Sequence, residues 1–179
     1  KRRPPIFTLF PITTLFRSAW DSDIMINKNG KTPVWVYSNA AKVELYRNGK
    51  KVGTATRKVN TTAAGHKYYT YTTQSDDSSV CTTGSGTNST SLYSVFNVAY
   101  EKGTISAKAY DESGKEITEV NGTSSVSTPD APAKLAVSKD KETITADGSS
   151  LSYITVDVTD ANGNLDTTAT NNIRFTLTG

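Results

Sequence analysis

Asn-Gly pairs punctuate this sequence, and such pairs are the strongest short signal for a tight turn between two β-strands. They occur at 29–30, 48–49, 121–122 and 162–163. In VELYRNGKKVG (43–53) the residues before the turn alternate, so that Val43 and Leu45 share one face and Glu44 and Tyr46 share the other. Alternation with a period of two is typical of half-buried strands. The stretch therefore predicts a hairpin with Val43 and Leu45 in a core.

Short alternating segments continue along the chain, and we find no convincing helical periodicity after residue 30. Strands of this length and spacing are typical of β-sandwiches. The predicted fold class is therefore all-β, an Ig-like β-sandwich followed by an incomplete second Ig-like β-sandwich. The predicted strands are 34–38, 42–47, 50–56, 67–73, 92–99, 103–110, 115–119, 133–138, 142–146, 151–159 and 172–178.

Composition breaks divide the chain into three parts. The segment STPDAPAK (127–134) carries two prolines and marks a boundary between domains. We expect a linker or the end of an upstream domain in 1–31, a sandwich in 32–128, and the beginning of a second domain in 132–179. The polar stretch 75–91 is interpreted as a long loop.

The second domain has too few strands to close a sandwich. About four strands are predicted after residue 132, whereas an Ig-like sandwich needs about seven strands and roughly 100 residues. Half a sandwich exposes an apolar face and an unpaired edge. We therefore expect residues 133–179 to be ordered only by contact with residues 32–128 or with a second copy of the chain, so that a dimer is a real alternative.

Composition and charge argue against several classes of protein. No apolar run approaches the ~20 residues of a membrane span, and the net charge of +3 includes no basic stripe interleaved with aromatics, so we expect neither a membrane nor a nucleic-acid partner. Cys81 is the single cysteine and has no internal disulfide partner. Few cysteines among many Ser, Thr and Asn residues favour a secreted or cell-surface bacterial protein, with a cytoplasmic chain as the alternative.

The sequence offers no convincing catalytic residues. Catalysis by a pair of carboxylates needs both groups at a fixed, short separation on a rigid scaffold. Asp76-Asp77 falls in the predicted loop, and Asp21 and Asp23 fall in the predicted linker. The pair His66 and Cys81 is interpreted as a surface imidazole and a loop thiol rather than as a nucleophile and its base.

Metal ligands are also too few to predict a site or a cofactor. One His and one Cys do not make a zinc site. The oxygen-bearing residues between 157 and 164 resemble a Ca²⁺ loop but lack the Gly and terminal Glu spacing of an EF-hand. A solvated hairpin is the preferred interpretation for them, namely for Asp157, Asp160, Asn162 and Asn164.

Two aromatic pairs are the remaining candidates for a binding surface. Trp35 and Tyr37 share one face of a predicted strand, and Tyr69 and Tyr71 share one face of another. The preferred interpretation is packing, with Trp35 as a core or interdomain tryptophan and the tyrosines paired across strands. The alternative is a carbohydrate-binding face, since aromatic rings stack on sugars.

Three segments in fixed order resemble a known family. They are PVWVYSNAAKVELYRNGKKVG (33–53), VFNVAYEKGTISAKAYDESGKEI (95–117) and PAKLAVSKDKETITADGSSLSYITVDVTDANGNL (132–165). Together they are similar to the region that follows the catalytic barrel in bacterial glycoside hydrolase family 2 β-galactosidases. FRSAWDSDIM (16–25) is similar to the end of that barrel, with Trp20 at the matching position.

The resemblance implies that the chemistry lies elsewhere in a longer protein. The family's two catalytic glutamates lie on barrel strands upstream, and no segment here is similar to their surroundings. We therefore expect a non-catalytic structural or accessory region that packs on the upstream catalytic barrel of a β-galactosidase. The alternatives are a carbohydrate-binding module that contacts glycans and a bacterial adhesin-like Ig repeat.

Overall fold

The computed structural model describes Trp20 and residues 31–75, 80–82, 93–118 and 124–176. These residues form β-strands and no helix, which confirms the predicted all-β class. The chain divides into two compact units, Lys1–Ser127 and Thr128–Gly179. Because the described part contains no helix, it offers no helical segment of the length and apolarity needed to span a membrane.

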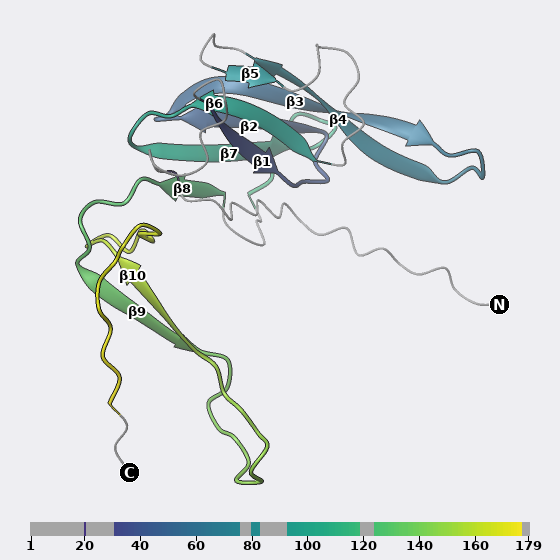
Figure 1. Cartoon of the computed structure of the whole chain (residues 1–179). Helices are drawn as coiled ribbons and strands as arrows, with labels where there is room; N and C mark the ends of the chain where they lie inside the picture. Colours follow the sequence, from purple (N-terminus) through teal and green to yellow (C-terminus); the bar gives the residue numbers. More distant parts are fainter. Residues whose placement is uncertain (1–19, 21–30, 76–79, 83–92, 119–123, 177–179) are drawn as a thin grey trace, which may run out of the picture. The chain divides into compact units, whose positions relative to one another are not determined.

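The first unit contains two antiparallel sheets (Figure 1). One sheet has the order β1-β6-β5 and the other the order β4-β3-β2-β7-β8. The strands β3 and β4 continue beyond the rest of their sheet as a long paired ribbon. The strands are β1 (Lys31–Val36), β2 (Lys42–Arg47), β3 (Lys50–Thr61), β4 (Lys67–Ser75), β5 (Val80–Thr82), β6 (Ser94–Ala99), β7 (Thr104–Tyr110) and β8 (Ser125–Ser127).

Both sheets contribute alternate residues to one core. From the smaller sheet come Val34, Val36, Phe96 and Val98, and from the larger sheet Val43, Leu45, Val52, Ala55, Tyr71, Ile105 and Ala109. The two sheets lie close together at Gly53, where a Cβ atom would lie only 2.8 Å from the Phe96 ring. The prediction that Val43 and Leu45 load the core is confirmed, since both are fully buried.

Trp20 also belongs to this core, although it precedes the first strand. Its indole is 2% exposed, and its Nε1 donates a hydrogen bond to the Glu101 carbonyl oxygen at 2.9 Å. The Tyr100 ring lies 5.3 Å away, centroid to centroid. Trp20 is therefore attached to the turn that connects β6 and β7.

The hairpin β2–β3 turns as its sequence predicts. Asn48 and Gly49 have φ values of 51° and 78°, the positive values that a type I′ turn requires. The Asn48 side chain also fixes the neighbouring turn: its Oδ1 accepts from the Thr104 N–H at 2.7 Å, and its Nδ2 donates to the Lys102 carbonyl at 3.1 Å. Gly103, with a φ of 132°, packs against the Asn48 side chain.

The second unit contains one two-stranded sheet, formed by β9 (Lys134–Lys139) and β10 (Ile154–Thr159). In its register Leu135 faces Val158, and Val137 faces Val156. Alternation places these four aliphatic residues on one face. Leu135 and Val137 are 53% and 66% exposed, so that the described residues leave much of this face open to solvent.

Several predicted strands are wrong, and a missing pairing partner is the common reason. Residues 142–146 and 172–176 have no strand conformation, and the described part of the strand predicted at 115–119, residues 115–118, forms only a single bridge between Tyr110 and Glu116. Conversely, β5 lies inside the stretch 75–91 that was interpreted as a loop, where it pairs with β6. The strand predicted at 50–56 extends to Thr61, because β4 pairs along its whole length.

Replacing Gly103 by alanine should destabilise the fold more than the same replacement at Gly65. A Cβ at position 103 would lie 2.0 Å from Asn48 Oδ1, whereas one at Gly65, with a φ of +82°, would meet no atom within 4 Å. We expect Gly65→Ala to cost about 1–2 kcal/mol through backbone strain alone. Gly103→Ala should cost roughly 3 kcal/mol or more, since it also displaces Asn48 and its hydrogen bonds. Urea denaturation measures both, and equal losses would contradict the contact at Gly103.

The exposed face of the second unit should make β10 unstable. In a monomeric chain whose second unit does not touch the first, we expect the amides of residues 154–158 to exchange with solvent much faster than those of β2, because few apolar contacts hold this sheet together. Hydrogen exchange followed by NMR measures this, with sedimentation velocity to establish that the sample is monomeric. Strong protection of 154–158 in a monomer whose second unit does not touch the first would contradict the prediction.

Candidate functional site

Trp35 lies on the outer face of β1, and the interpretation of it as a core tryptophan is wrong. Val34 and Val36 take the inward positions of the strand, so the period of two directs Trp35 away from the core. The Trp35 side chain is 46% exposed. Tyr37 follows on the same side, just after the strand ends, and is half-buried.

Tyr93 joins these two residues into one cluster. Its ring lies 5.3 Å from the Trp35 ring at an interplanar angle of 27°, and 5.2 Å from the Tyr37 ring at 40°. We call Trp35, Tyr93 and Tyr37 the aromatic row. Sequence reasoning missed Tyr93, which lies next to β6. The antiparallel register of β1 with β6, which ends at Val36 opposite Ser94, was the signal that would have placed it beside Tyr37.

Tyr69 and Tyr71 do not join the aromatic row, because they lie on β4 in the other sheet. Tyr71 is 1% exposed, and its hydroxyl lies 2.7 Å from the carbonyl oxygens of Ser38 and Ala40. Burial raises the pKa of Tyr71 to about 12. Tyr69 lies under the guanidinium of Arg57, 4.5 Å from its ring centroid. Tyr71 is therefore a core residue and offers no free ring face.

Glu44 is the centre of a polar network on β2 and β7. Its Oε2 accepts hydrogen bonds from the Tyr46 and Tyr110 hydroxyls at 2.7 and 2.9 Å, and its Oε1 accepts from Lys42 Nζ at 3.0 Å. Lys42 also lies 4.1 Å from the centroid of the Tyr110 ring. These contacts join β2 and β7 on the face of the sheet away from the core.

The electrostatics of this network suit a structural role. Burial opposes ionisation of Glu44, but the hydrogen bonds from Tyr46, Lys42 and Tyr110 outweigh it and lower its pKa to about 2. The hydrogen bond to Glu44 raises the pKa of Tyr46 far above its ordinary value. A carboxylate that is ionised and already saturated with donors cannot serve as a proton donor at neutral pH.

Asp160 is also engaged by its own surroundings, rather than lying in a solvated hairpin as expected. It is fully buried, and its carboxylate accepts from the backbone N–H groups of Asp130, Asn162 and Asn164 and from the Asn164 amide. These donors, the Asn164 side chain above all, lower the pKa of Asp160 to about 2. The carboxylate closes a loop, with N–H groups where a cation would need open oxygens.

The other candidates are scattered or lie outside the described residues. Asp21, Asp23 and Asp76-Asp77 are outside them, as is the side chain of Cys81. His66 is exposed in the turn between β3 and β4, where its backbone N–H donates to Thr62 Oγ1 at 3.1 Å. Within the ranges that the structure describes, no three His, Cys, Asp or Glu side chains are grouped as a metal site would require.

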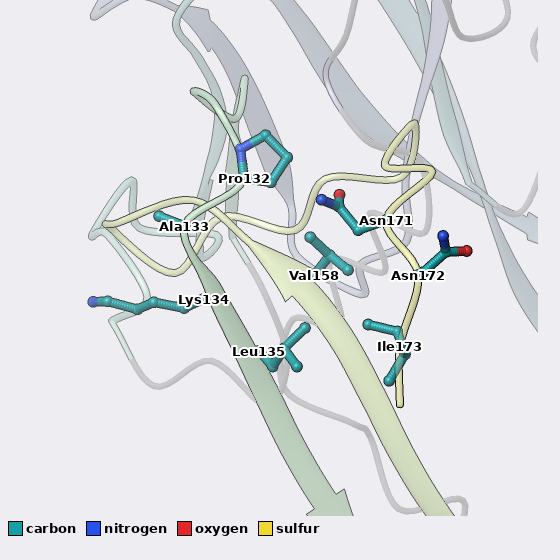
Figure 2. A pocket seen from close by; sticks show the side chains of 8 residues that line it. All are labelled: Pro132, Ala133, Lys134, Leu135, Val158, Asn171, Asn172 and Ile173. Carbon is teal, nitrogen blue, oxygen red and sulfur yellow. The ribbon is translucent and has the colours of Figure 1, made fainter. Parts of the chain in front are cut away.

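A groove of about 290 Å³ opens in the second unit (Figure 2). The side chains of Leu135, Val158 and Ile173 gather along it, and Asn171 and Asn172 lie on the segment that borders β10. The lining contains no carboxylate. The groove is therefore an opening in a partly formed apolar core, without the groups that acid–base chemistry needs.

Removing the Glu44 charge should change stability in a pH-dependent way. Because its pKa is lowered from 4.5 to about 2 in the folded chain, Glu44 stabilises the fold above pH 4.5, and this contribution is lost as the pH falls toward 2. We expect Glu44→Gln to cost about 1–2 kcal/mol at pH 7, and the difference from the unmodified chain to shrink between pH 4.5 and 2.5.

Urea denaturation at pH 7, 4.5, 3.5 and 2.5 measures this difference. Glu116→Gln is the matched control, because Glu116 is 42% exposed and forms one ion pair with Lys108 at 3.2 Å on the same sheet. It should cost no more than ~0.5 kcal/mol. A Glu44→Gln deficit that stays constant down to pH 2.5 would contradict the role of the network.

Comparisons with known proteins divide the chain into two family domains. Residues 29–118 match the family described as a domain of unknown function, DUF4982. Residues 135–179 match glycoside hydrolase family 2 C-terminal domain 5. The first match includes the β2–β3 hairpin and most of the first unit, and the second includes β10 and nearly all of β9.

Three relatives extend these matches. Beta-galactosidase BoGH2A of Bacteroides ovatus is 29% identical over 147 residues, which are 82% of this chain and 13% of that protein. A crystal structure of a glycosyl hydrolase family 2 member from Bacteroides cellulosilyticus has a TM-score of 0.50 and 24% identity, over 86% of this chain and 18% of the other. A second structure of a family 2 member from that organism has a TM-score of 0.50 and 26% identity, over 82% and 14%.

The chain thus spans only a small part of each relative that it matches. Along the chain, the DUF4982 match comes first and the match to C-terminal domain 5 follows it. The chain belongs to the C-terminal β-sandwich region of glycoside hydrolase family 2 proteins, with a DUF4982 domain followed by C-terminal domain 5.

Proposed function

We propose that this chain is a non-catalytic accessory region of a family 2 β-galactosidase, which hydrolyses terminal β-galactosides at a barrel upstream. The observation that carries the proposal is the similarity to Beta-galactosidase BoGH2A over 82% of the chain, together with the two family domains in series. An adhesin-like Ig repeat is less well supported, because the match to family 2 C-terminal domain 5 and the similarity to Beta-galactosidase BoGH2A both favour a glycoside hydrolase.

The state of the carboxylates supports the non-catalytic part of the proposal. A retaining glycosidase needs two carboxyl groups free to face a sugar from either side of the scissile bond. Here Glu44 is saturated by three side-chain donors, and Asp160 by four hydrogen bonds from loop residues. Glu101 lies 3.1 Å from Arg47 Nε in an ion pair. These groups hold the fold together instead of facing a substrate.

Trp20 supports attachment to an upstream barrel. The segment 16–25 is similar to the barrel end of the family, and its Trp20 is buried in the first unit with a hydrogen bond to Glu101. The burial and the hydrogen bond fix the position of Trp20 itself relative to the sandwich. We therefore propose that the first unit packs on the barrel and helps to hold its geometry.

The apolar face of the second unit is largely open to solvent in the described chain. Leu135, Val137 and Ile154 each remain more than half exposed. Burying such side chains contributes about 1.5–3 kcal/mol each. We propose that this face is covered in solution by the first unit or by a second copy of the chain. Sedimentation velocity over a range of concentrations distinguishes the two, because only the second makes the mass rise with concentration.

The isolated chain should be catalytically silent. We expect no turnover of nitrophenyl β-galactoside above the buffer rate, because Glu44 and Asp160, the buried carboxylates among the described residues, are already engaged by hydrogen bonds of the fold. Release of nitrophenol followed by absorbance measures this, with an active β-galactosidase as the positive control. Turnover that survives repurification and is abolished by a single Asp or Glu substitution in this chain would refute the non-catalytic assignment.

A further inference from the structure

We propose that the aromatic row, Trp35, Tyr93 and Tyr37, binds the apolar face of a β-galactosyl unit. The choice of sugar rests on the proposed function, and the site itself rests on the geometry of the three rings. Neither matched family description assigns a ligand to this face.

The row is exposed although its side chains are strongly apolar. Trp35 leaves 46% of its surface in solvent, while the core positions on either side of it are filled by valines. A side chain of this kind gains more from burial than most, and an exposed tryptophan that is held in place is a frequent mark of a binding surface. The described structure places no other side chain in ring contact with the open part of the indole.

Stacking holds the row in one conformation before any ligand arrives. Tyr93 lies between the other two rings, with centroid distances of 5.3 and 5.2 Å. Trp35 is paired across the sheet with Val95, so that the indole rests on a rigid antiparallel pair of strands. A rigid aromatic group loses little conformational entropy on binding, which favours ligand association.

The chemistry of the row fits a galactosyl ring. The axial hydroxyl at C4 of β-galactose leaves the C–H groups of C3, C4 and C5 together on the opposite face, and that patch can lie flat on an indole. The sugar hydroxyls at the rim of the patch are acceptors and donors for the phenol groups of Tyr37 and Tyr93. A neutral polar ligand also suits the aromatic row, because the row contains no Asp, Glu, Lys or Arg side chain.

The size of the row favours a sugar over a protein partner. Aromatic side chains present about 150–250 Å² each when fully open, so three partly covered ones expose on the order of 200 Å². A stable protein interface needs about 800 Å² on each side. The row can therefore cover one or two sugar units, with a dissociation constant in the millimolar range for a single one.

The experiment uses the whole chain and its own tryptophans. Of the two in the sequence, Trp20 is buried and Trp35 is exposed, so acrylamide should quench mainly Trp35. We expect soluble β-1,4-galactan to reduce this quenching at least twofold, and dextran to leave it unchanged. Affinity electrophoresis in gels containing galactan should retard the chain.

Two variants complete the test. Trp35→Ala should lose retardation by galactan at least tenfold, whereas Tyr69→Ala, an aromatic truncation in the other sheet, should retain it. Far-UV circular dichroism checks that both variants are folded, and if Trp35→Ala is not, the quenching of the unmodified chain decides alone. Unchanged quenching with galactan, or equal retardation of both folded variants, would overturn the proposal.

The two proposals fail separately. Absence of galactan binding removes the sugar site and leaves the accessory role intact. Turnover of nitrophenyl β-galactoside by the chain would refute the non-catalytic role. The quenching of Trp35 would still show whether the aromatic row binds galactan.

Discussion

The contact of Phe96 with the backbone of Gly53 sets the distance between the two sheets of the first unit. No side chain larger than hydrogen fits at Gly53, because a Cβ would lie 2.8 Å from the phenyl ring. Around this point the inward residues of both sheets meet and are fully buried, among them Leu45 and Tyr71. Every outward position follows from that inward packing, including the positions of Trp35 and Glu44, because side chains alternate along a strand.

Local sequence signals predicted the elements that depend on local geometry. The β2–β3 hairpin was accessible because Asn48-Gly49 specifies a type I′ turn and the alternation of Val43 and Leu45 specifies the buried face. The sequence was a poorer guide to strands that form only because a segment distant in the sequence pairs with them. β5 is a strand because β6 lies beside it, and 142–146 is not a strand because no described neighbour pairs with it.

The candidate site shows the same division between local and distant information. The alternation showed that Trp35 and Tyr37 share a face, but it did not show whether the core lies on that face or on the opposite face, which carries Val34 and Val36. Val34 and Val36 occupy the core, and Trp35 is left outside. Tyr93 could be placed only through the register of β1 with β6, which the separate segments do not specify. The family resemblance identified the region, while the ring geometry came from the fold alone.

Trp20 separates two meanings of the word domain. The family match begins at residue 29, and the predicted sandwich begins at residue 32, so both place Trp20 outside the domain. Energetically it lies inside, because it is 2% exposed and belongs to the same cluster as Val36 and Phe96. The unit of homology is therefore smaller than the unit of folding. A recombinant boundary drawn at the first matched residue would remove an indole from the core and leave the Glu101 carbonyl without that donor.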